Sequence, residues 1–208
     1  MSQPGLCQRF GEHHDLQVLL FEPLFEEANR TRRLIAQMAR GLDAAGIGLI
    51  IACLSGTGES DVGTDHITLA GWQADAATLA AHFRPTVIAS LRGGALIDSA
   101  ALAGGYWRFS PESGARIVRD LRRTQAAGDS DLFAGNRLSE GFVAELEAAG
   151  LAPVSLLRIV RLESEAAEAD AKVVGSPLWR RAEPGEDTAL AQALAADLAA
   201  WVQTCAAS

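Results

Sequence analysis

The stretch "TVIASLRGGALIDSAA", residues 86–101, constrains the fold of this chain more than any other. An apolar run of strand length, 86–90, leads into two glycines and then into a segment of small and apolar residues. This order predicts a strand, an abrupt turn and a helix, the layout of a nucleophile elbow with the pattern G-x-S-x-G. In that register Ser90 takes the first small position, Gly94 takes the last, and Arg92 is the tip. The turn therefore carries a cation where a reactive hydroxyl would stand.

The first half of the chain alternates between strand-like and helix-like patterns. Continuous apolar runs predict strands, and apolar residues recurring every three or four positions predict helices. The expected strands are 16–24 (ending near Pro23), 47–54 and 86–90, and the expected helices are 29–46, 68–83 and 94–104. Asn29 is predicted to cap the first helix and Gly46 to end it. Such alternation predicts a parallel sheet with right-handed crossovers.

The second half is less regular. Helices are expected over 112–125, 138–150 and 186–206, and strands over 131–135, 153–160 and 171–179. The stretch 104–114 is a weak candidate for the strand after the turn, and 164–170 is too short for a full crossover helix. No repeat or domain boundary is visible. The prediction is a peripheral N-terminal segment, 1–15, and a single domain, 16–208.

Composition and charge exclude several classes of protein. The chain has 208 residues, of which 49% are hydrophobic and 21% charged, and these values are ordinary for a globular domain. A net charge of −8 argues against general affinity for nucleic acid or anionic membranes. No signal peptide and no run of about 18 apolar residues is present, so no membrane span is expected. Three widely spaced cysteines without a C-x-x-C motif predict a reduced, cytoplasmic protein.

The turn and its neighbours together resemble the α/β-hydrolase fold, and more closely the exosortase A system-associated hydrolases of the second type, which occur beside exopolysaccharide export genes. Four stretches carry the resemblance, "PLFEEANRTRR" (23–33), "SLRGGAL" (90–96), "AGNRLSEGFVAELEAAGL" (134–151) and "AKVVGSPLWRRAE" (171–183). The family's turn, G-L-R-x-G-A-L, also has arginine at its tip, whereas Ser90 replaces its glycine. The resemblance implies a mostly parallel, twisted sheet with helices on both faces and a reduced cap.

A serine-hydrolase mechanism lacks two of its three groups in this register. Such a mechanism needs a hydroxyl, a histidine and a carboxylate, and in this fold they follow one another as serine, acid and histidine. All four histidines, His13, His14, His66 and His82, precede the turn. The Arg92 guanidinium stays protonated and is no nucleophile. Ser90 is the remaining candidate, but it stands two residues before the tip. No spacing predicts a metal site, and no cofactor is expected.

Arg92 itself has two interpretations. At the tip of the turn its side chain would point into the cleft near a helix N-terminus, where an anion is favoured. Arg92, with Asn29 or Trp179 nearby, could therefore hold a carboxylate, a phosphate or an acidic sugar. A buried arginine also needs a partner, and an internal ion pair would close the cleft. The ion pair is the favoured interpretation, and its candidate partners are Glu26, Glu27 and Glu183.

Two functions follow from these observations. The first is a non-catalytic binding or accessory factor linked to exopolysaccharide export, whose partner is a small anionic ligand or a protein of that pathway. The alternative is an active serine hydrolase, an esterase or acyl-transfer enzyme, whose triad is not identified. Self-association into a homodimer is a further expectation, because domains of this kind often pair.

Overall fold

The computed structural model describes residues 7–58, 60–128, 132–133 and 135–207. In this part of the chain seven strands form one sheet in the order β1-β3-β2-β4-β5-β6-β7. β1 runs antiparallel to β3, and all other neighbouring strands are parallel. The strands are β1 Gln8–Phe10, β2 Leu16–Phe21, β3 Ile47–Ile51, β4 Val87–Leu91, β5 Gly105–Phe109, β6 Leu157–Leu162 and β7 Ala171–Val173. The helices are α1 Glu26–Ala44, α2 Leu69–Phe83, α3 Gly114–Gly128, α4 Glu140–Ala148 and α5 Thr188–Ala206.

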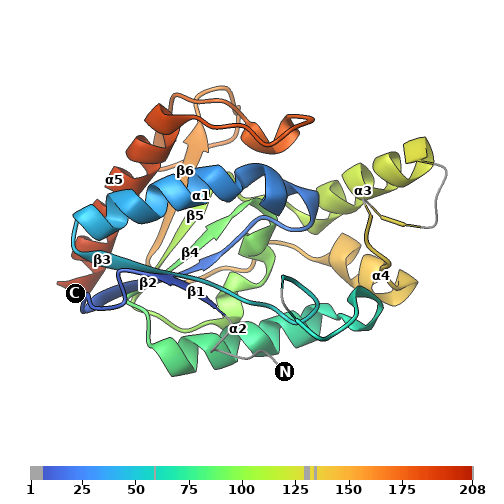
Figure 1. Ribbon diagram of the computed structural model, residues 1–208, viewed down its shortest axis with the longest axis horizontal. Coiled ribbons are helices and arrows are strands. Elements are labelled where there is room, and N and C mark those ends of the chain that lie inside the picture. The colour runs from blue at the N-terminus through green and yellow to red at the C-terminus, as the bar shows by residue number, and fades with distance from the viewer. Residues whose placement is uncertain (1–6, 59, 129–131, 134, 208) are drawn as a thin grey trace.

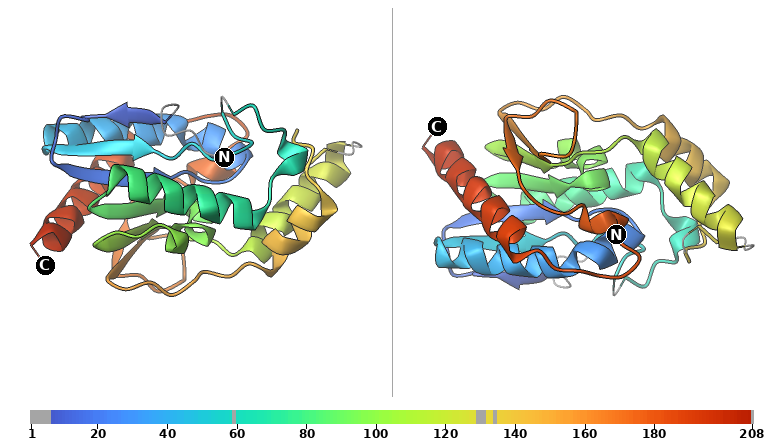
Figure 2. Two further views of the ribbon diagram at one scale, coloured as in Figure 1. Left: turned by 90° about the horizontal axis from the view of Figure 1, so that it is seen from below. Right: turned by 90° about the horizontal axis from the view of Figure 1, so that it is seen from above.

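Helices cover both faces of the sheet (Figures 1 and 2). α1 and α5 pack together on one face, and α2 lies on the other. Alternate side chains of β2 point to opposite faces of the sheet. Val18 and Leu20 pack in the core under α1 and α5, whereas Leu19 and Phe21 pack in the core under α2. Successive side chains of a strand point to opposite faces, so a strand covered on both sides is apolar throughout. The predicted class, a mostly parallel α/β sheet, is confirmed.

The connection between β5 and β6 holds two helices that pack on each other. α3 and α4 form this pair, and in Figure 1 they lie to the right of the sheet. The loop between β3 and α2 is tied to the pair, because Leu69 N donates to Glu145 Oε2 at 2.9 Å and Thr64 Oγ1 donates to Arg137 O at 3.0 Å. This pair is the reduced cap of the molecule. Among the described helices, none is both long and apolar enough to cross a membrane.

The first helix begins earlier than predicted. α1 starts at Glu26, so Asn29 lies inside the helix and is not its cap. The residue before the helix is Phe25, with φ 57°, and no side chain caps the helix there. Glu26 and Glu27 in the first turn suit the positive end of the helix dipole and compensate for the missing cap. The last helical residue is Ala44, and Gly46, just after the C-cap Ala45, has φ 77°, the left-handed conformation of a glycine that ends a helix, so the predicted stop is confirmed.

The helix predicted over 94–104 is wrong. Two short 3₁₀ turns, η3 Arg92–Leu96 and η4 Asp98–Ala100, take its place. Asp98 is fully buried and binds Arg108 of β5, which holds this segment against the sheet. A side-chain contact that no local pattern shows therefore overrides helix propensity.

Several strand boundaries also differ from the prediction. The weak candidate stretch 104–114 contains β5, a fully buried strand. The predicted strand 153–160 begins only at Leu157, and 171–179 forms a strand only over Ala171–Val173. Part of the predicted strand 131–135 lies outside the described residues, and the described part contains an isolated bridge between Phe133 and Asn136. Within the segment 1–15, β1 pairs with β3 at the sheet edge.

Candidate functional site

The turn after β4 has the tight geometry that the sequence predicts. Arg92 at its tip has φ 54°, a left-handed conformation that is costly for a residue with a side chain. At Gly94 a Cβ atom would lie 2.5 Å from the carbonyl oxygen of Phe21 and 2.7 Å from that of Glu22. Gly94 therefore lets the turn pass directly against the end of β2.

The Arg92 guanidinium is enclosed by protein groups. Glu27 accepts hydrogen bonds from Nε and Nη2, each at 3.2 Å. Nη1 donates to the Ser110 carbonyl at 3.2 Å and to Glu112 Oε2 at 3.4 Å. On its remaining side the guanidinium carbon lies 4.6 Å from the centre of the Trp179 ring, a cation–π contact. Only 5% of the side chain is exposed. The geometry is that of an internal ion pair.

Two carboxylates share this one guanidinium. Burial raises the pKa of Glu27, the ion pair with Arg92 opposes that rise, and the nearby charge of Glu112 adds to it. Glu112 also binds Arg116 at 3.2 Å, so the second carboxylate has a partly exposed cation of its own. The cluster is therefore balanced in charge, and its hydrogen bonds use four of the five N–H donors of Arg92.

Trp179 reaches Arg92 from the segment that follows the last strand. The 3₁₀ turn η5, Leu178–Arg180, carries it, and Arg30 of α1 donates to its carbonyl at 3.0 Å. In a hydrolase triad of this fold the histidine is the last member in chain order. Here the segment after β7 presents an indole ring to the tip of the turn, and the ring is 3% exposed.

Apolar side chains pack beside the residue that follows the tip. In an elbow the N–H of the residue after the tip serves as an oxyanion donor. A Cβ atom at this residue, Gly93, would lie 2.6 Å from Ile117 Cδ1 and 2.9 Å from Leu24 Cγ. These apolar side chains occupy the space next to Gly93.

Ser90 lies within β4, beneath the turn, and is fully buried. Its Oγ donates to Asp98 Oδ2 at 2.7 Å. Arg108 donates to both oxygens of Asp98, each at 2.8 Å. Burial raises the pKa of Asp98, and the hydrogen bonds from Arg108 and Ser90 oppose the rise. The Ser90 hydroxyl is thus engaged in a buried polar network.

The other predicted site residues are divided by α1. Glu27 faces Arg92, whereas Glu26 and Asn29 are exposed and line a cavity on the opposite side of the helix. Glu26 lies 3.9 Å from Arg30. Glu183 is exposed and is not among the partners of Arg92. The structure therefore brings Arg92, Glu27 and Trp179 together and separates them from the remaining candidates.

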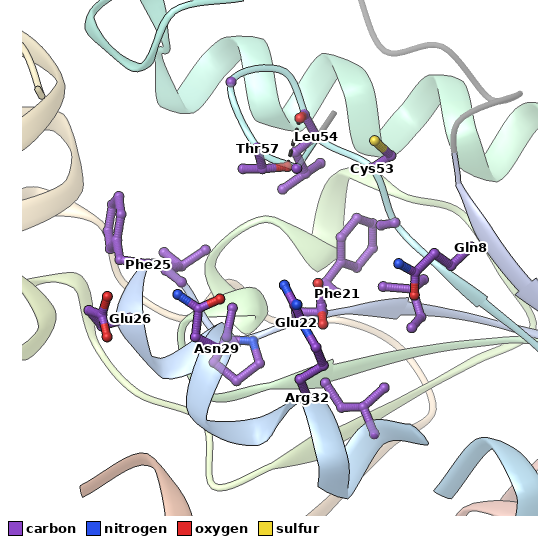
Figure 3. A pocket seen from close by; sticks show the side chains of 18 of the residues that line it. Gln8, Phe21, Glu22, Phe25, Glu26, Asn29, Arg32, Cys53, Leu54 and Thr57 are labelled. Atoms are coloured by element: carbon purple, nitrogen blue, oxygen red, sulfur yellow. Dashed lines mark hydrogen bonds between the residues drawn. The ribbon is translucent and has the colours of Figure 1, made fainter. Parts of the chain in front are cut away.

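The cavity has a volume of about 620 Å³ and lies over the carboxyl ends of β2 and β3. Its apolar wall includes Phe25, Leu54 and Trp72. Figure 3 shows the Arg32 side chain extending from α1 beside Glu22, which follows β2, and Asn29 on the same helix one turn earlier. In open α/β sheets ligands bind outside the carboxyl ends of the strands. The cavity is therefore the candidate ligand site.

Glu22 is a half-buried carboxylate that lines this cavity. Burial raises its pKa, and the charge of Arg32 opposes the rise. Arg32 is exposed and, within the described residues, forms no ion pair. Its guanidinium is thus available to a ligand, unlike that of Arg92.

Sequence reasoning missed several of these residues. Glu22 lies near the end of a predicted strand, beside Pro23, and Arg32 stands three residues after Asn29 on one face of a predicted helix, so both had a usable signal. Glu112 follows β5, whose strand pattern was weak. The pairing of Asp98 with Arg108 had no local signal.

No protein-family model and no curated protein matches the sequence. Solved structures of similar shape include alpha/beta hydrolase domain-containing protein 10 from mouse, with a TM-score of 0.65 at 10% identity over 95% of this chain and 93% of that one. AqDC, described in recognition and ring-cleavage of the Pseudomonas quinolone signal, has a TM-score of 0.59 at 14% identity over 95% of both chains. Juvenile hormone epoxide hydrolase from the silkworm Bombyx mori has a TM-score of 0.56 at 12% identity over 92% of this chain and 69% of that one. This chain has the α/β-hydrolase fold.

Proposed function

We propose that this protein is a non-catalytic α/β-hydrolase-fold protein that binds a small anionic molecule and acts as an accessory factor linked to exopolysaccharide export. The observation that carries the proposal is the closed cluster at the turn, where Arg92 is held by Glu27, Glu112 and Trp179. The link to export rests on the sequence resemblance to the exosortase A system-associated hydrolases.

Three further features support the loss of catalysis. The Ser90 hydroxyl is buried and donates to Asp98. The space beside Gly93 is filled by apolar side chains. No histidine follows the turn in the sequence. Acyl transfer by this fold requires a nucleophile, an oxyanion donor and a general base. The burial of Ser90 and the lack of a histidine after the turn argue against a nucleophile and a general base at this place.

The cavity beside α1 supports the binding role. A volume of about 620 Å³ lies in the range of small-molecule sites, which combine apolar walls with a few polar groups. Arg32 supplies a cation at its rim, Asn29 supplies an amide, and Glu22 supplies a half-buried carboxyl whose pKa is raised by burial. We infer a ligand with an acidic group directed to Arg32 and an apolar or sugar body against Phe25 and Trp72.

Catalysis is tested by incubating the purified protein with p-nitrophenyl esters of short acids and with a fluorophosphonate probe. The expected result is no turnover and no labelling above a heat-denatured sample. Turnover or labelling that disappears in Ser90→Ala would establish the alternative, an active serine hydrolase.

Binding is tested by thermal-shift measurements with uronic acids, sugar phosphates and short fatty acids. At least one class is expected to raise the melting temperature of the wild type and to lose that effect in Arg32→Gln. Arg33→Gln is the matched control, because Arg33 is exposed on the same helix and lies 3.7 Å from Glu186, away from the cavity. Equal shifts in both variants, or no shift with any class, would reject the cavity as the binding site.

A further inference from the structure

Two histidines and one carboxylate meet at the end of the molecule opposite the turn. His13 and His14 lie in the loop between β1 and β2, and Asp43 lies in the last turn of α1. Each residue offers one ligand atom, and these atoms all lie within 4.8 Å of one another. His14 Nε2 is 2.9 Å from Asp43 Oδ1, and the two imidazole rings are 4.0 Å apart between centres. The grouping was not visible in the sequence, where Asp43 stands far from the histidines.

The loop that carries the histidines is held in place by its own hydrogen bonds. His14 N donates to the Gly11 carbonyl at 3.1 Å, and Gln17 Nε2 donates to the His14 carbonyl at 2.6 Å. Gly11 has φ 59°, and a Cβ atom there would lie 2.7 Å from His14 Cδ2 and 2.8 Å from Asp43 Oδ1. Glycine thus permits the loop to press the His14 ring against α1. The His14 side chain is 18% exposed, so its position is largely set by the protein.

The local charge favours a cation. Asp43 stands at the negative end of the α1 dipole, and the last turn of this helix contains no basic residue. The protein carries a net charge of −8. Imidazole nitrogen and carboxylate oxygen are the ligands that zinc and its neighbours in the first transition row prefer.

We propose that His13, His14 and Asp43 bind one divalent transition-metal ion, with Zn²⁺ as the first candidate. Zinc bonds of about 2.1 Å in a tetrahedron leave the ligand atoms about 3.4 Å apart. The separations here span that value, from 2.9 Å to at most 4.8 Å, and His13 and Asp43 are exposed and able to turn. The ion would replace the His14–Asp43 hydrogen bond and join the β1–β2 loop to α1. Three protein ligands leave a further position for water.

The site is tested on the full chain with metal alone. Co²⁺ is titrated into metal-free protein while visible absorption is recorded, and Zn²⁺ affinity is measured by calorimetry. One equivalent of each metal is expected to bind, and Zn²⁺ is expected to raise the melting temperature. His13→Ala and Asp43→Asn are expected to weaken binding at least tenfold and to abolish the temperature shift.

Two controls separate this site from other histidines and from misfolding. His66→Ala and His82→Ala change exposed histidines elsewhere and are expected to retain wild-type affinity. Circular dichroism of the metal-free variants checks that each one folds. The proposal is overturned if the wild type binds no metal, or if His13→Ala and Asp43→Asn bind it as tightly as His66→Ala does.

Discussion

At the scale of single residues, Arg92 determines what the turn can do. Its backbone is in the conformation that an elbow requires, with φ 54°. Its side chain forms ion pairs with Glu27 and Glu112 and contacts the Trp179 ring. Phe25 and Ser110 also have positive φ and lie after β2 and β5, beside the turn. Strained residues persist where surrounding contacts over-determine them. Contacts of Arg92 with both neighbouring loops provide that constraint here.

Removal of Arg92 leaves two carboxylates without their shared cation. Arg92→Met is expected to lower the free energy of unfolding by about 3–5 kcal/mol, because breaking a buried ion pair exposes the full cost of the remaining buried charge. Arg123→Met is the control, since its pair with Asp120 is exposed and is expected to contribute less than about 1 kcal/mol. Urea denaturation measures both. Equal losses in the two variants would show that the cluster is not a stabilising ion pair.

Glu22 makes stability depend on pH. Because burial raises its pKa in the folded state, the folded protein binds a proton where the unfolded chain has already lost it. Stability therefore falls as the pH rises from about 4.3, the usual glutamate value, through the raised pKa of Glu22. Glu22→Gln removes this loss, so its advantage over the wild type is expected to grow with pH and then level off. Urea denaturation of both proteins across this range checks the trend, and a difference independent of pH would contradict it.

At the scale of elements, the turn is defined by how closely it approaches β2. Gly94→Ala would bring a Cβ atom within 2.5 Å of the Phe21 carbonyl, and backbone cannot move aside as a flexible side chain can. A loss of about 1–3 kcal/mol in the free energy of unfolding is expected. Gly150→Ala is the matched control, because a Cβ atom there meets nothing within 4 Å. If chemical denaturation shows that both substitutions leave the free energy of unfolding unchanged, the close approach of Gly94 to β2 is contradicted.

One carboxylate of α5 joins the helix to two strands of the sheet. Asp197 accepts from Arg158 Nη2 at 2.6 Å and from Trp107 Nε1 at 2.8 Å, so it joins α5 to both β6 and β5. Burial would raise the pKa of Asp197, but the hydrogen bonds from Arg158 and Trp107 outweigh burial and lower it.

Asp197→Asn is therefore expected to be destabilised at neutral pH. The wild-type contribution is present above about pH 3.9, the usual aspartate pKa, and is lost as the pH falls through the lowered value. The difference between the two proteins should shrink in acid, as measured by thermal or urea unfolding at neutral and acidic pH. A gap that widens in acid would reverse the assigned sign.

At the scale of the whole molecule, the structure consists of a central sheet and a smaller cap. β2 and β4 are central strands with buried residues on both faces, whereas α3 carries exposed arginines along one side and packs mainly on α4. Regions with fewer buried contacts open at lower free energy than the core. The amides of β4 are expected to exchange with solvent only through global unfolding, and those of α3 through partial opening. Native-state hydrogen exchange in increasing denaturant measures the two free energies, and equal values would show that the cap and the sheet unfold together.

The sequence alone determined the features that are written in local order. The alternation of apolar runs with helical periodicity predicted the parallel sheet, and the spacing of Ser90, Arg92 and Gly94 predicted the turn. The order of residues also showed that no histidine follows Arg92. These features depend on neighbours along the chain, so a single sequence contains them in full.

Only the tertiary structure decided which distant residues meet. Glu112 reaches Arg92 because β5 pairs with β4, and Trp179 reaches it because η5 packs against α1. Asp43 reaches His14 because α1 returns along the sheet to the β1–β2 loop. The same arrangement put Asn29 on the cavity side of α1 and Glu27 on the other side. Such contacts follow from strand order and helix packing, where a shift of one residue changes which side chains face each other. For that reason local sequence patterns could not predict the full set of partners of Arg92 or the position of the cavity.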